Sequence, residues 1–170
     1  MKNISSFLLF LIGTFAYAQM GSMTIYNFST QSVSYNLMGT NDNSFPMDCQ
    51  PIVEGNSATP LAPSSTVVYS QYNTSHLVTP PINQWAVISE AIGIPGQTYN
   101  VSAGVAIPPV ITTPTSWQSL RLTFSNGETI HLARDCGYVD SHHGAFNEST
   151  ASGITATWNY LGNNVVVFIN

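Results

Sequence analysis

The chain has 170 residues, of which 6% are charged and 44% hydrophobic, and its formal net charge is −5 at pH 7. Three basic residues cannot release many counterions from a phosphate backbone or hold a protein on anionic lipid headgroups. The composition therefore argues against nucleic acid and acidic membranes as partners, and it predicts a surface wetted by Ser, Thr, Asn and Gln.

The first 18 residues have the three parts of a secretory signal peptide. Lys2 supplies the positive charge, residues 7–12 the apolar run, and Ala16-Tyr17-Ala18 the small residues before a cleavage site. We expect cleavage after Ala18 and a single mature domain, residues 19–170, that is secreted to the extracellular space or the periplasm. Because a membrane span needs about 20 apolar residues, we expect no membrane span.

Strand patterns dominate the rest of the chain. No stretch after the signal keeps apolar residues at positions i, i+3, i+4 and i+7 for three turns, whereas two-residue alternation recurs between Gly, Pro and Asn turns. In chain order we expect strands at residues 23–28, 32–37, 66–72, 84–89, 98–107, 120–124, 128–132, 154–160 and 165–169, with a brief pairing at residues 49–53. A short polar link separates the first two, which predicts an opening hairpin.

Residues 120–132 predict a second hairpin with a defined turn. A two-residue Asn-Gly loop would place Leu122 opposite His131 and mix the apolar and polar faces. A three-residue loop instead places Leu122 opposite Ile130, with Gly127 at the position that needs a left-handed backbone. We expect this three-residue loop, which makes Arg121 and His131 face each other on the side away from the core.

The remaining segments complete an all-β prediction. Residues 101–107 predict a buried strand that ends at Pro108 and Pro109, residues 137–153 a long polar loop, and residues 165–169 a central strand covered on both faces. About eight or nine short strands favour a single-domain antiparallel β-sandwich after a cleaved signal peptide.

The two cysteines predict a disulfide. Cys49 and Cys136 are the only cysteines, and cysteines of an exported protein usually pair. The bridge would close a loop of almost 90 residues. A catalytic thiol is the alternative, and it would need a nearby base.

Residues 135–148 hold the densest cluster of reactive side chains. Asp140, His142, His143 and Glu148 could ligate zinc or another divalent ion, and His131 could join them if the loop folds back over its strand. The spacing matches no strong zinc signature, so a solvated polar loop is the competing interpretation. No other cofactor is indicated.

Aromatic residues are the candidates for ligand binding. Flat rings stack on the C–H faces of sugars, while amides and hydroxyls bind the sugar oxygens. Trp117, next to a loop, with Tyr72 and Tyr138, is the set we expect to recognise a ligand, whereas Trp85 and Trp158 lie in alternating strands and are expected in the core.

Three functional hypotheses follow. The first is a secreted, non-enzymatic binding protein for a neutral extracellular ligand, either glycan or protein. The second is a metal-dependent secreted hydrolase that uses the 135–148 loop. The third is an adhesive or self-assembling structural subunit. No motif for nucleophilic catalysis or phosphate binding is present in the sequence.

Overall fold

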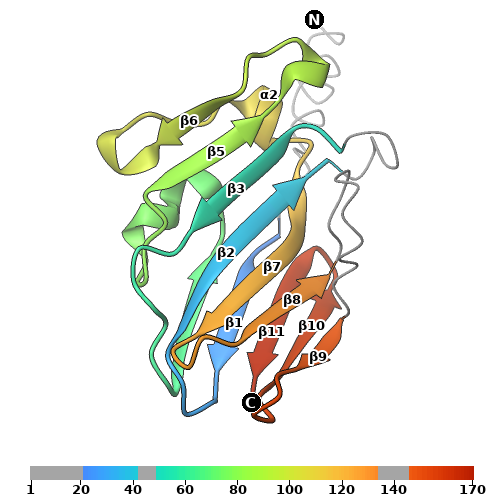
Figure 1. The fold of residues 1–170 in the computed structure, drawn as a ribbon. Helices are drawn as coiled ribbons and strands as arrows, with labels where there is room; N and C mark the ends of the chain where they lie inside the picture. The colour runs from blue at the N-terminus through green and yellow to red at the C-terminus, as the bar shows by residue number, and fades with distance from the viewer. Residues whose placement is uncertain (1–20, 42–48, 134–145) are drawn as a thin grey trace, which may run out of the picture.

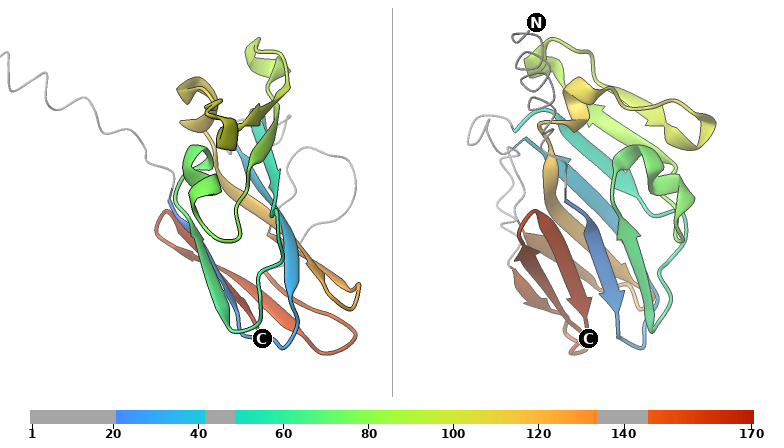
Figure 2. Two further views of the ribbon diagram at one scale, coloured as in Figure 1. Left: turned by 90° about the vertical axis from the view of Figure 1, so that its left-hand side faces the viewer. Right: turned by 180° about the vertical axis from the view of Figure 1, so that it is seen from behind.

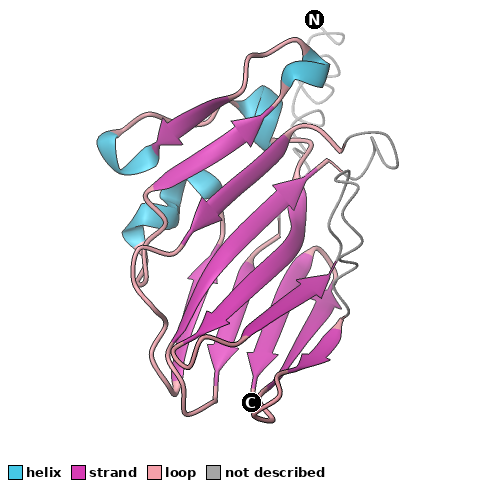
Figure 3. Ribbon diagram, in the orientation of Figure 1, coloured by secondary structure: helices cyan, strands magenta, loops and turns pink. Residues whose placement is uncertain are grey.

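The structure, a computed structural model, describes residues 21–41, 49–133 and 146–170 (Figure 1). These residues form two β-sheets with only short helical turns between the strands (Figure 3). The five-stranded sheet has the order β4-β1-β11-β10-β9, and its strands are β1 Met23–Asn27, β4 Ser65–Tyr69, β9 Asn147–Ser149, β10 Thr155–Leu161 and β11 Asn164–Ile169. The six-stranded sheet has the order β6-β5-β3-β2-β7-β8, and its strands are β2 Val33–Thr40, β3 Ile52–Asn56, β5 Gln84–Ile88, β6 Gln97–Asn100, β7 Ser116–Phe124 and β8 Thr129–Ala133.

The expected all-β class is confirmed, and the two-residue alternation is its cause. Buried and half-buried residues alternate along β1, because successive side chains of a strand point to opposite faces. The same alternation holds along β2 as far as Leu37. Each sheet therefore buries one face and leaves the other more exposed. Figure 2 shows the two sheets from the side and from behind.

The expected opening hairpin is wrong. β1 and β2 lie in different sheets, where β1 pairs with β4 and β11 and β2 pairs with β3 and β7. The short link between them crosses from one sheet to the other, and buried Asn27 holds it by donating from its side-chain amide to the carbonyls of Gln31, Leu61 and Ala62. Alternation identified both strands, but it carries no information about which strand pairs with which.

The second hairpin forms as expected. In the β7–β8 pair Leu122 faces Ile130, Leu120 faces Leu132 and Arg121 faces His131. Gly127 has a φ of 87°, and its amide donates to the carbonyl of Phe124 at 2.9 Å. The three-residue loop therefore sets the register of this pair.

Three other expectations need correction. Residues 101–107 are not a strand, because the 3-10 turn η4 (Val101–Ala103) ends β6 and precedes the helical turn α2 (Pro109–Thr112). The predicted polar loop at 137–153 contains the short edge strand β9. The strand at the C-terminus is central, as expected, but only one of its faces is fully buried, because Val166 and Phe168 on the other face are half-buried.

One hydrophobic cluster receives side chains from both sheets. It includes Ile25 and Val167 from the five-stranded sheet and Leu37 and Leu122 from the six-stranded sheet. The helical turns contribute as well, with Ile111 of α2 buried in the same cluster. The two sheets therefore pack against each other through this shared cluster.

Three rings form the aromatic centre of that cluster. Tyr72 begins the 3-10 turn η2 (Tyr72–Leu77), and its ring centroid lies 4.9 Å from the ring of Trp85 on β5 and 4.9 Å from the ring of Trp117 on β7, both in edge-on geometry. The indole nitrogen of Trp85 donates to the hydroxyl of Ser75 at 2.9 Å. Burying the indole is therefore compatible with its polar N–H.

Candidate functional site

The outer face of the six-stranded sheet carries the candidate site. Its inner residues enter the core, so the residues between them point outward, and these are mainly amides and hydroxyls. Asn36 on β2 lies directly opposite Asn56 on β3 and Arg121 on β7, and Arg121 lies opposite His131 on β8. A row of four polar side chains therefore crosses four neighbouring strands.

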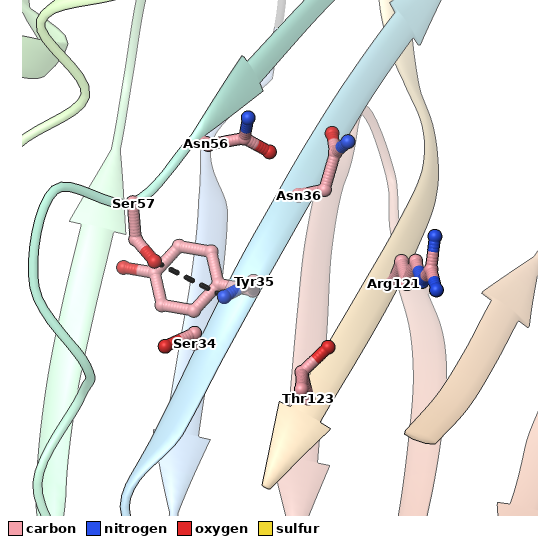
Figure 4. Close-up of a pocket in the computed structure, with 7 residues that line it drawn as sticks. All are labelled: Ser34, Tyr35, Asn36, Asn56, Ser57, Arg121 and Thr123. Carbon is pink, nitrogen blue, oxygen red and sulfur yellow. Dashed lines mark hydrogen bonds between the residues drawn. The ribbon is translucent and has the colours of Figure 1, made fainter. Parts of the chain in front are cut away.

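A small hollow opens over this row (Figure 4). It has a volume of about 230 Å³, and the residues lining it are Ser34, Tyr35, Asn36, Asn56, Ser57, Arg121 and Thr123. Two of these residues are joined directly, because the backbone amide of Tyr35 donates to the side-chain hydroxyl of Ser57 at 3.0 Å. The ring of Tyr35 itself is buried, with 3% of its surface exposed, so the polar side chains form the accessible wall.

A larger hollow adjoins the first. It has a volume of about 570 Å³, and the residues lining it are Glu54, Gly55, Asn56, Ser57, Ala58, Asn83, Gln84, Ala86 and Thr98. Asn56 and Ser57 line both hollows. We call the two together the polar groove; it extends from β7 across β2, β3 and β5 to β6.

Two charged residues line the polar groove, one in each hollow. Glu54 lies in the larger hollow, and its carboxylate accepts a hydrogen bond from the amide nitrogen Nδ2 of Asn36. Arg121 lies in the smaller hollow and is exposed. Within residues 21–41, 49–133 and 146–170, it is the only Lys or Arg, and its guanidinium has no hydrogen-bond or ion-pair partner.

Two of the three aromatic residues expected to bind a ligand lie in the core. Trp117 and Tyr72 have 2% and 1% of their surfaces exposed, so neither offers a ring face to a ligand at the surface. Trp117 is the second residue of β7 and so lies near a loop as expected, but its side chain is buried, and its indole nitrogen donates to the carbonyl of Gly21 at 2.6 Å. Tyr138, the third member of that set, lies outside the described residues.

The expected metal ligands are not brought together by the part of the chain that is described. Asp140, His142 and His143 lie outside it, Glu148 is half-buried on the edge strand β9, and His131 lies on β8 opposite Arg121. Among residues 21–41, 49–133 and 146–170 no group of three or more His, Cys, Asp or Glu side chains could hold a metal ion. Cys49 is fully buried, and its expected disulfide partner Cys136 lies outside the described residues. The disulfide stays a prediction.

An aromatic strip lies on the outer face of the other sheet. The rings of Tyr26, Phe28 and Phe168 are nearly parallel, with interplanar angles of 12–16° and centroids 5.3–6.4 Å apart. Tyr26 and Phe168 are half-buried on this face. Phe28 is the most open of the three, with 57% of its surface exposed.

Sequence reasoning missed the groove residues. Asn36, Asn56 and Gln84 occupy outward positions of alternating strands, and this pattern marks them as exposed without showing that they are neighbours. Only the pairings of β2 with β3 and of β3 with β5 place them along one groove.

No family model, curated protein or solved structure matches this chain. Within the described residues, no helix has the length and apolar character needed to cross a membrane.

Proposed function

We propose that this chain is a secreted β-sandwich that binds a mainly neutral oligosaccharide in the polar groove, without catalysing a reaction. The observation that carries the proposal is the lining of the groove. Amides of Asn36, Asn56 and Gln84 and hydroxyls of Ser57 and Thr98 alternate along it, with one carboxylate and one guanidinium.

The chemistry of these side chains suits sugars. Each sugar hydroxyl both donates and accepts a hydrogen bond, and Asn, Gln, Ser and Thr side chains do the same. An anionic polymer would need a field of positive charge, which a groove with one guanidinium and one carboxylate does not provide. The groove crosses five strands, and this extent suits an extended chain of sugar units.

We propose binding without catalysis because the groove has one carboxylate where a glycoside hydrolase needs two. Most glycoside hydrolases act through a pair of carboxyl groups on either side of the scissile bond. Among the residues lining the two hollows, Glu54 is the one carboxylate, and its partner is the amide of Asn36.

The sandwich and the secretion belong to the same proposal. Two sheets that share one hydrophobic cluster support a sandwich architecture. The signal-peptide pattern of residues 1–18 and the scarcity of charged residues support an extracellular setting.

Calorimetric titration of the mature protein, residues 19–170, with oligosaccharides selected on a glycan array tests the proposal. We expect Asn56→Ala and Gln84→Ala each to weaken binding by roughly 3- to 10-fold, the loss of about one hydrogen bond. Asn159→Ala is the matched control, because Asn159 is an exposed amide on the outer face of the other sheet.

Two results would overturn the proposal. One is an array on which no glycan binds the folded mature protein. The other is a glycan that binds equally well to the wild type and to the Asn56→Ala, Gln84→Ala double variant, which would place the site elsewhere.

A further inference from the structure

We infer that the smaller hollow of the polar groove takes the carboxylate of an acidic sugar unit, so that the preferred ligand is an oligosaccharide with one uronic- or sialic-acid unit at the β7 end. The inference rests on the proposed function and names the ligand class of the same site. It starts from Arg121, whose guanidinium forms no hydrogen bond or ion pair with the other residues lining the groove.

The charge balance makes Arg121 unusual. After removal of Lys2 with the signal, two arginines remain against eight carboxylates, a net charge of −6. In so acidic a chain an arginine is expected to find a carboxylate partner. Arg121 has none within the described residues, although it lies exposed in the middle of β7. Its guanidinium is therefore available to an anion from outside.

The surroundings of Arg121 fit a sugar acid better than a bare anion. A guanidinium binds a carboxylate through two parallel hydrogen bonds, and this geometry fixes the direction of the bound group. Thr123 lies on the same strand and face, and Asn36 on the neighbouring strand lies directly opposite Arg121. Beyond them Asn56 and Ser57 line the far side of the hollow and offer partners for the ring hydroxyls (Figure 4).

The second charged residue gives the ligand a direction. Glu54 lines the larger hollow, where its carboxylate disfavours an acidic unit by like-charge repulsion. An acid group is therefore accepted over β7 and disfavoured over β3 and β5. The neutral part of the oligosaccharide then lies toward Gln84 and Thr98.

The test uses a glycan array built from matched pairs, in which each acidic glycan stands beside the same glycan without the acid group. Sialyllactose with lactose, and xylotriose carrying a single glucuronic acid unit with unsubstituted xylotriose, are two such pairs for titration. We expect the acid member of at least one pair to bind about 10- to 100-fold more tightly, the effect of charge-assisted hydrogen bonds. A free uronic acid, titrated separately, distinguishes a sugar-acid site from a site for any small carboxylate.

Variants connect the preference to Arg121. Arg121→Gln should abolish the difference between the two members of a pair, while Arg121→Lys should keep part of the difference. Gln84→Ala, in the other hollow, should weaken both members equally. Because Arg121 is exposed and unpartnered within the described residues, the thermal unfolding of its variants should match that of the wild type.

The outcomes separate this inference from the proposed function. Equal binding of acidic and neutral members overturns the inference and leaves neutral glycan binding in place. An acid preference that survives Arg121→Gln, or a free uronic acid that binds as tightly as the oligosaccharide, also overturns it. If no glycan of either kind binds, both fail.

Discussion

The hydroxyl of Tyr35 on β2 lies 2.7 Å from the hydroxyl of Tyr69 on β4 and joins the two sheets inside the core. Tyr69 donates to the carbonyl of Pro80 at 2.5 Å, so Tyr35 is the donor to Tyr69. Both rings are buried, and they meet edge-on with centroids 6.2 Å apart. The order of donation makes the two tyrosines unequal.

Tyr69→Phe should destabilise the protein more than Tyr35→Phe. Removing the Tyr69 hydroxyl leaves the buried hydroxyl of Tyr35 and the carbonyl of Pro80 without partners. This should lower the free energy of unfolding by about 1–3 kcal/mol. Removing the Tyr35 hydroxyl takes away one donor but leaves Tyr69 bonded to Pro80. This should lower the free energy of unfolding by about 0.5–1.5 kcal/mol. Urea unfolding measures both, with Tyr26→Phe on the outer face as control, and the reverse ranking would contradict the assigned direction of donation.

The same pair predicts instability at alkaline pH. Burial raises the pKa of Tyr69 to about 12 and also raises that of Tyr35, where the neighbouring Tyr69 adds to the effect. In the unfolded chain both ionise near pH 10. The stabilisation by the neutral pair is thus complete below about pH 10 and is lost as the pH rises toward the folded-state values. Urea midpoints measured across this range should fall for the wild type and fall less steeply for the Tyr35→Phe, Tyr69→Phe double variant.

Glu128 predicts a loss of stability at acid pH. Its carboxylate accepts hydrogen bonds from the amide of Ser152 at 2.9 Å, from the Ser152 hydroxyl, and from Asn126 at 2.6 Å, and so it ties the β7–β8 turn of one sheet to the β9–β10 turn of the other. The Ser152 hydroxyl is the main cause that lowers the pKa of Glu128 below its usual 4.5. The stabilisation is present above about pH 4.5 and is lost as the pH falls through the lowered value.

Glu128→Gln should therefore remove part of the acid dependence of the unfolding midpoint. Ser152→Ala should reduce the same dependence while keeping the carboxylate, because it removes the principal donor. A Glu128→Gln curve that runs parallel to the wild type down to pH 3 would be evidence against this link.

Two glycines should respond differently to substitution. A Cβ at Gly55 would lie 2.7 Å from side-chain carbons of Ile82 and Trp85, so Gly55→Ala overpacks the core and should cost about 1–3 kcal/mol. A Cβ at Gly127 would meet nothing within 4 Å, and there the cost comes only from the φ of +87°. Gly127→Asn should consequently be milder than Gly127→Ala, because Asn tolerates the left-handed region, whereas at Gly55 Asn should be worse than Ala. Thermal unfolding of the four variants makes the comparison.

The expected disulfide is open to a direct test. Mass spectrometry of the exported protein, with and without reduction, should show a mature chain without free thiols at Cys49 and Cys136. The Cys49→Ser, Cys136→Ser double variant should lose up to about 4 kcal/mol of stability, because the bridge restricts a long loop in the unfolded chain. Alkylation of both cysteines without prior reduction would disprove the pairing.

Local patterns predicted what is local in this fold. The β7–β8 hairpin followed from Gly127 and from the matching of apolar faces, since both strands and their turn lie within a few residues. The partners of β1 did not follow, because its parallel pairing with β11 joins residues about 140 positions apart. The polar groove was missed for the same reason, since its side chains become neighbours only through such distant pairings.

Trp117 was misplaced by an irregularity in the sheet. The register between β2 and β7 shifts between Met38 and Gly39, and residues 117–120 are all buried. This run breaks the two-residue alternation that marks a strand in sequence, so the first part of β7 looked like a loop. A bulge of this kind leaves no signal that periodicity can detect.

The parallel partnership of β1 and β11 bears on the order of assembly. β11 lies in the middle of its sheet, between β1 and β10, so the β4-β1 pair and the β10-β9 pair stay separate until β11 docks. Before that step β1 and β10 each present an edge of unsatisfied backbone groups. Because the residues that must meet lie about 140 positions apart in the chain, closing this sheet carries a large loop-closure cost, and we expect it late in folding.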